Sequence, residues 1–170
     1  MVSMPTPVLL WTVTQSVAWW AVNHWVQRAF PGVRVLTPQR LAHWLSEGKD
    51  PSPILLDVRQ ADEFAVSHLP GAHPTPSLEA VLALGIPPDQ PVVVYCSVGY
   101  RSARLATQLQ EAGYTQVYNL AGSIFQWANQ GRSLVQSGQP TRAVHPYNPV
   151  WGLLLKPGLA HQPDSPPASG

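Results

Sequence analysis

The feature that most constrains the fold is a short β-branched run that ends at the chain's single cysteine. The run is Val92–Tyr95, and Cys96 follows it directly. Such a run, with a loop on each side, predicts a buried strand. A six-residue loop that starts at Cys96 leads into Ser102–Ala112, which has helical spacing and is closed by Gly113. The sequence therefore predicts a strand, a tight turn at a cysteine, and a helix.

Other segments repeat this alternation of strand and helix. Thr37 is a candidate N-cap, with Pro38 at the first helical position, for a helix that ends at Gly48. Further elements are expected as the strands Ile54–Leu56 and Gln116–Leu120 and the helices Ser77–Leu84 and Ile124–Asn129. Because strands that alternate with helices form parallel sheets, we expect an α/β fold with a central parallel sheet flanked by helices on both faces.

Cys96 is a candidate nucleophile because of where the predicted strand ends. Loop amides and the positive end of the following helix would face a common centre and stabilise negative charge on sulfur. Gly99 allows the backbone to curl, and the guanidinium of Arg101 favours the thiolate, which is the reactive form. The alternative is a buried, inert cysteine at a strand end, which is common for this residue type.

Composition narrows the class of protein. Charged residues make up 11% of the chain and its net charge is +1, so we expect no binding to nucleic acid. A lone cysteine cannot form an internal disulfide, which favours a reducing compartment, and we expect a cytoplasmic protein. No metal site is expected, because the histidines are scattered and lack a paired spacing with Cys96 or a carboxylate: His24, His43, His68, His73, His145 and His161.

Residues 1–32 form a tryptophan-rich segment that carries no Lys, Arg, Asp or Glu before Arg28. Four tryptophans fall within fifteen positions: Trp11, Trp19, Trp20 and Trp25. Polar residues interrupt the apolar run, so it matches poorly to the roughly twenty apolar residues of a membrane span, and it lacks the basic region of a signal peptide. We expect a helix with a wide apolar face. That face would pack on the domain or a partner chain, contact a membrane interface through residues 1–30, or span a membrane.

The chain of 170 residues suffices for one domain with extensions, and we place the domain at residues 33–136. Residues 137–170 are rich in proline, which predicts an extended or disordered tail. Within the tail, Val150–Leu155 is a short apolar patch suited to docking back on the domain.

Several short motifs, taken in order, resemble the rhodanese family. The active-site loop of that family follows a pattern close to Cys, Arg, any, Gly, any, Arg or Thr, which Cys96, Gly99 and Arg101 match. The likeness covers roughly Val33–Gly131, about three-fifths of the chain. Its other marks are Leu56–Arg59, Glu63–Phe64, His68–Ala72, Gly113–Tyr114, Asn119–Gly122 and Trp127.

Two positions depart from the family pattern. Ser97 stands where many members have Arg, which removes a positive charge from the mouth of the site and counts against a doubly charged donor such as thiosulfate. Ser123 stands where a second Gly is usual, and we expect this to change only a turn.

The resemblance implies a rhodanese-like fold and a sulfurtransferase that needs no cofactor. The thiolate of Cys96 would take the outer sulfur of thiosulfate or a persulfide, and a thiol such as glutathione or thioredoxin, or cyanide, would remove it. Arg101 would orient an anionic donor. Substrate binding is implied for Ser97, Val98, Gly99, Tyr100 and Ser102, and ion pairing near the pocket, rather than acid–base catalysis, for Asp57, Arg59 and Glu63.

Two other functions compete with this one. Cysteine phosphatases and arsenate reductases place five residues between Cys and Arg, whereas four separate Cys96 from Arg101 and Ser102 stands at the phosphatase position, which favours sulfur over an oxyanion. A non-enzymatic sulfur carrier or interaction module is the other candidate, with the tryptophan-rich leader and proline-rich tail as docking segments. The retained Cys96 argues against a module without chemistry.

Overall fold

Five parallel strands form the central sheet of the molecule. The structure is a computed structural model that describes residues 6–48 and 50–162, with side chains from residue 14 onward. The strands lie in the order β1-β5-β4-β2-β3, and neighbouring strands are parallel throughout, which confirms the predicted fold class. They are β1 (Arg34–Leu36), β2 (Ile54–Asp57), β3 (His73–Pro74), β4 (Val92–Tyr95) and β5 (Val117–Leu120).

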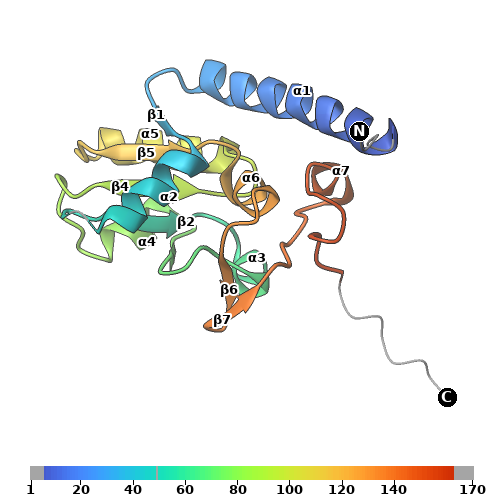
Figure 1. Cartoon of the computed structure of the whole chain (residues 1–170). Coiled ribbons are helices and arrows are strands. Elements are labelled where there is room, and N and C mark those ends of the chain that lie inside the picture. The colour runs from blue at the N-terminus through green and yellow to red at the C-terminus, as the bar shows by residue number, and fades with distance from the viewer. Residues whose placement is uncertain (1–5, 49, 163–170) are drawn as a thin grey trace.

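Helices cover both faces of this sheet, as the sequence predicts (Figure 1). Successive residues of β4 point to opposite faces, so Val93 and Tyr95 enter one core and Val92 and Val94 enter the other. The first core lies under α2 (Pro38–Glu47) and α6 (Ser123–Asn129), and the second under α4 (Leu78–Leu82) and α5 (Tyr100–Glu111). A short helix, α3 (Ala61–Val66), follows β2.

Local sequence accounts for the main helix boundaries. The hydroxyl of Thr37 accepts a hydrogen bond from Arg40 N–H at 3.3 Å, and Gly48 ends α2 with φ 59°, both as predicted. Helix α5 begins at Tyr100, earlier than predicted, because Gly99 turns the chain with φ 115°. The sequence did not indicate the shortest elements, which depend on neighbouring segments: β1, α3, β3, β6 (Leu134–Gln136), β7 (Gln139–Thr141) and α7 (Pro149–Gly152).

The tryptophan-rich segment forms one long helix, α1 (Thr6–Ala29), that runs across the domain (Figure 1). Trp19 and Val26 are 7% and 5% exposed, and Trp19 belongs to the core under α2 and α6. Val17 and Trp20 remain 61% and 67% exposed. The described side chains thus support packing on the domain. Within residues 6–48 and 50–162, no helix combines the length and apolarity that crossing a membrane requires.

The proline-rich tail differs from the extended or disordered segment expected for residues 137–170. Its described part, up to residue 162, contains β7 and α7 and buries Val144, Leu155 and Leu159, which are at most 5% exposed. Pro149 occupies the first turn of α7, where its missing N–H is not needed. Apolar residues between the prolines therefore outweigh proline content, and this part of the tail is folded. Residues 163–170 lie outside the described residues.

Side chains of two helices anchor this C-terminal extension. Asn129 of α6 donates to the carbonyl of Leu154 at 2.7 Å and accepts from the backbone N–H of Lys156 at 2.8 Å. Gln15 of α1 donates to the carbonyl of Leu153 at 2.9 Å. The predicted docking patch is thus attached through its backbone and through buried Leu155.

A buried ion pair fixes the carboxyl end of β2. Arg59 donates to the carboxylate of Asp57 through Nε and Nη2, with a shortest distance of 2.7 Å, and Nη2 also donates to the carbonyl of Ser67 at 2.6 Å. Burial opposes the charge of Arg59, but hydrogen bonding to Asp57 and its negative charge outweigh burial, so the pKa of Arg59 is raised. Both side chains are fully buried, so each charge depends on the other.

Replacing Asp57 with alanine is expected to lower the free energy of unfolding by about 3–5 kcal/mol, because Arg59 would stay buried without its partner. Urea denaturation followed by circular dichroism measures this change. Asp89→Ala, at an exposed turn, is the matched control and should change it by less than about 0.5 kcal/mol. Equal effects of the two substitutions would contradict a structural role for the pair.

Candidate active site

Cys96 lies at the carboxyl end of the central strand β4, where α/β folds place their ligand sites. The thiol is 1% exposed, and the loop that follows turns directly into α5. The first turn of α6 holds this loop, because Ile124 N–H donates to the carbonyl of Cys96 and Phe125 N–H to that of Ser97, both at 3.2 Å. Two helices thus position the cysteine.

Hydrogen-bond donors of the loop converge on the sulfur of Cys96. The backbone N–H of Gly99 lies 3.1 Å from Sγ, and the hydroxyl of Ser102 lies 3.5 Å from it. Burial alone would raise the pKa of the thiol. The positive charge of Arg101 and hydrogen bonds from Ser102 and Gly99 outweigh burial, so the pKa of Cys96 is lowered. The arrangement therefore favours a thiolate, as a nucleophile requires.

Asn119 and Ser123 brace this loop from the neighbouring strand and helix. Asn119 accepts from the hydroxyl of Ser102 at 2.7 Å and donates to the carbonyl of Gly99 at 2.9 Å. The hydroxyl of Ser123 accepts from the backbone N–H of Cys96 at 3.0 Å. Ser123 therefore does more than alter a turn, contrary to expectation, although its φ of 48° is that of a position suited to glycine.

Sequence reasoning did not assign a role to either residue. Asn119 belongs to the family motif Asn119–Gly122, which was a usable signal for a polar side chain at the end of β5. Ser123 stood out as a departure from the family pattern, but its partner Cys96 lies 27 positions away, so nothing local indicated the contact.

Arg101 at the mouth of the site forms a closed polar cluster with Glu63 and Ser97. Its two terminal nitrogens donate to the two oxygens of Glu63, each at 2.8 Å, and Nη2 donates to Ser97 Oγ at 2.9 Å. Burial raises the pKa of Glu63, but the hydrogen bonds from Arg101 and the backbone of Gln60, together with the charges of Arg101 and Arg59, outweigh burial, so the pKa of Glu63 is lowered. The carboxylate of Glu63 therefore pairs the charge of Arg101.

The predicted site residues fall into two groups. Five line a cavity of about 160 Å³ above the sulfur: Cys96, Ser97, Val98, Tyr100 and Arg101. Gly99 and Ser102 support the sulfur from the loop and helix, and Glu63 touches the rim. Asp57 and Arg59 pair with each other and do not line the cavity.

Three aromatic residues that sequence reasoning did not connect with the site complete the lining. They are Trp25 of α1 and Tyr147 and Trp151 of the C-terminal extension. The many tryptophans of the tryptophan-rich segment indicated an apolar contact surface, but no local pattern indicated which of the rings would lie near Cys96.

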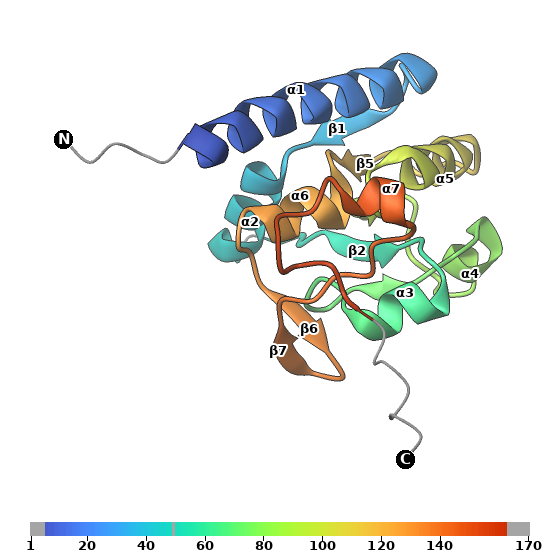
Figure 2. The same ribbon diagram turned by 90° about the vertical axis from the view of Figure 1, so that its right-hand side faces the viewer.

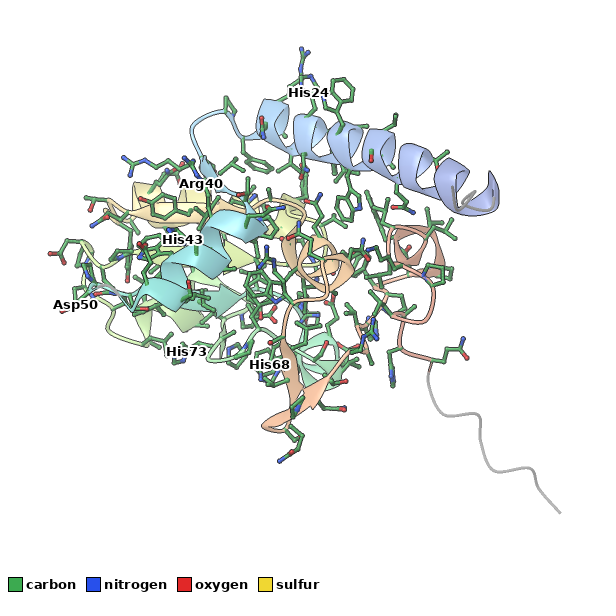
Figure 3. The ribbon with its side chains drawn as sticks, in the orientation of Figure 1. His24, Arg40, His43, Asp50, His68 and His73 are labelled. Carbon is green, nitrogen blue, oxygen red and sulfur yellow. The ribbon has the colours of Figure 1, made fainter. Side chains whose placement is uncertain are left out.

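The histidines do not assemble into a metal centre in the part of the chain that the structure describes. Figure 3 shows His24 on the outer side of α1, while His68 and His73 lie at the opposite end of the view. Among the described residues, no group of three His, Cys, Asp or Glu side chains could hold a metal ion.

Comparisons with known proteins agree with this geometry. Residues 37–130 match the family model described as Rhodanese-like domain. A protein of Allochromatium vinosum named sulfurtransferase is 34% identical over 104 residues, a match covering 61% of this chain and 95% of that protein. The probable adenylyltransferase/sulfurtransferase MoeZ of Mycobacterium tuberculosis is 34% identical over 98 residues, which are 56% of this chain. The matched segment is only 24% of MoeZ, so the chain spans about a quarter of that relative.

A solved structure shares the fold and part of the sequence. The polysulfide-sulfur transferase homodimer from Wolinella succinogenes superposes with a TM-score of 0.55 at 28% identity, covering 69% of this chain and 88% of that chain. The family model covers the sheet from β2 to β5, the cysteine loop and the helices beside it. This chain therefore belongs to the rhodanese-like domain family.

Proposed function

We propose that this protein is a sulfurtransferase that carries sulfane sulfur as a persulfide on Cys96. The observation that supports this proposal best is the hydrogen bond from Gly99 N–H to Sγ at 3.1 Å, with the backbone N–H of Ser102 as a second donor and the positive charge of Arg101 nearby. Donors in this arrangement favour negative charge on sulfur. Relatives named sulfurtransferase support the same reaction class.

In the first step the thiolate of Cys96 attacks the outer sulfur of a donor. A bond forms between Sγ and that sulfur, the S–S bond of the donor breaks, and the leaving group takes the bonding electron pair. The loop from Ser97 to Ser102 would hold the outer sulfur of the persulfide through its backbone amides. Because Glu63 is ionised and paired with Arg101, it supports the loop rather than supplying a proton.

In the second step an acceptor thiolate attacks the outer sulfur, and Cys96 leaves as the thiolate. The sulfur atom moves without a change in its oxidation level, so neither an oxidant nor a reductant is consumed. We take small thiols such as glutathione, or a thioredoxin, as acceptors, with cyanide as a laboratory substitute. A reactive thiol of this kind works in a reducing compartment, so the proposal includes a cytoplasmic location.

Donors with little charge fit the mouth of the site better than thiosulfate does. Ser97 occupies the position of a family arginine, and Glu63 pairs the charge of Arg101.

A persulfide on Cys96 should be detectable by intact-protein mass spectrometry. Incubation with thiosulfate or glutathione persulfide should add the mass of one sulfur atom to the wild type, and cyanide or excess thiol should remove it. Cys96→Ser keeps the size of the side chain and should gain no sulfur. Absence of any adduct on the wild type would refute the persulfide, and an adduct that no acceptor removes would indicate a sulfur carrier without turnover.

The lowered pKa of Cys96 predicts the pH dependence of its alkylation by iodoacetamide. As the pH is lowered, the alkylation rate should stay constant past pH 8.5, which is about the pKa of free cysteine. It should fall only at lower pH, where the thiolate of Cys96 becomes protonated. Arg101→Met and Ser102→Ala each remove a group that favours the thiolate. Both should move the inflection to higher pH and slow alkylation severalfold at neutral pH.

Arg104→Met is the matched control, because Arg104 is exposed on the same helix. Its inflection should equal that of the wild type. An unchanged inflection in both Arg101→Met and Ser102→Ala would contradict the proposed stabilisation of the thiolate.

A further inference from the structure

Aromatic rings from both ends of the described chain close the cavity above Cys96. Trp25 stacks on Tyr100 with centroids 4.6 Å apart and 14° between the planes. Trp151 lies 6.4 Å from Trp25 at 17°. Figure 2 shows α7, which carries Trp151, below α1. We call Trp25, Tyr147 and Trp151 the aromatic wall, and all three lie outside residues 37–130, the part that matches the family.

Specific contacts place the aromatic wall. The ring of Tyr147 covers the guanidinium of Arg101 at 4.7 Å, and the backbone of Tyr147 has φ 64°. A bulky residue in this conformation is uncommon, and such residues cluster at binding sites. The side chain of Asn148 caps α7 and accepts a hydrogen bond from the backbone N–H of Trp151 at 2.9 Å. This contact fixes the position of Trp151 in the first turn of the helix. Phe30 packs edge-on against Tyr100 at 5.0 Å, which fixes the ring that Trp25 stacks on.

The size and charge of the cavity restrict what enters it. Its volume of about 160 Å³ is close to that of apolar protein cavities that take up benzene, about 150 Å³. Arg101 is the only cation among the described residues that line it, and Glu63 pairs that charge. Aromatic faces are themselves electronegative. A hydrated dianion would therefore meet a thiolate and several ring faces, with no unpaired cation in the lining.

We propose that the aromatic wall makes this cavity selective for sulfur donors that carry a small aromatic group next to their sulfur–sulfur bond, over inorganic dianions. The proposal rests on the sulfurtransferase function above and names its substrate class. The rings of Trp25, Tyr147 and Trp151 line the cavity and offer aromatic contacts to the organic group, while the Cys96 loop binds the sulfur. Reactivity and selectivity thus come from different parts of the chain.

Three donors that differ only in the substituent on the sulfonyl sulfur, which is bonded to the sulfane sulfur, test this. They are benzenethiosulfonate, methanethiosulfonate and thiosulfate. With each, a bond forms between Sγ and the sulfane sulfur, the donor's S–S bond breaks, and sulfinate or sulfite leaves with the electron pair. Rates of persulfide formation, measured by rapid quenching and intact mass, are divided by the rates of the same donors with free cysteine.

The wild type should prefer benzenethiosulfonate over methanethiosulfonate by about tenfold or more after this correction, and thiosulfate should react most slowly. Trp25→Leu and Trp151→Leu should each reduce the preference for the ring, which is the ratio of the benzenethiosulfonate rate to the methanethiosulfonate rate, about threefold to tenfold. Trp20→Leu is the control, because Trp20 lies on the same helix, is 67% exposed and stacks on His24 outside the cavity. Circular dichroism verifies that every variant is folded.

The possible outcomes distinguish failure of the aromatic selectivity from failure of the sulfurtransferase function. A wild type that forms the persulfide with all donors but shows no ring preference overturns the aromatic selectivity and leaves the sulfurtransferase intact. A preference that survives in both Trp25→Leu and Trp151→Leu also overturns it. Absence of persulfide with every donor overturns both proposals.

Discussion

The structure depends on keeping a negative charge on a buried sulfur. Cys96 is almost inaccessible to water, so the thiolate exists only if protein groups replace its hydration. Gly99 and Ser102 do so at one side and Arg101 at the other. Gly99 can point its N–H inward because its φ is 115° and Asn119 holds its carbonyl. The sheet, by setting β4 beside β5, therefore supports the charge that the loop carries.

A second pair of opposite charges, Glu63 and Arg101, lies at the mouth of the cavity. Glu63 is buried and ionised, which is tolerable because Arg101 and Ser97 bind both of its oxygens. The same contacts bind Arg101, whose charge then acts on Cys96 through space more than on an incoming anion. The Ser97 position links these effects, since a small hydroxyl there completes the cluster where a second arginine would compete for Glu63.

The sequence allowed prediction of those parts that adjacent residues encode. Strand β4, the turn at Cys96 and helix α5 follow from a β-branched run, a glycine and helical spacing within one stretch, and the structure has all three. The contact of Ser123 with Cys96 joins residues that are 27 positions apart, so no local pattern reports it. The described part of the C-terminal extension is folded despite its prolines. Proline content alone does not reveal this, because Val144, Leu155 and Leu159 lie far apart in the sequence from the core residues on which they are buried.

The aromatic wall also affects the order in which the protein folds. Contacts around Cys96 join residues up to 38 positions apart, whereas the contact of Trp25 with Trp151 closes a loop of most of the chain and carries a larger entropic cost. This cost predicts that the wall docks after the cysteine cradle has formed and opens at a lower free energy than the whole domain. A growing or partly opened chain exposes a low-pKa thiolate, the form most sensitive to oxidation. Closing the wall therefore protects the sulfur during the life of the protein.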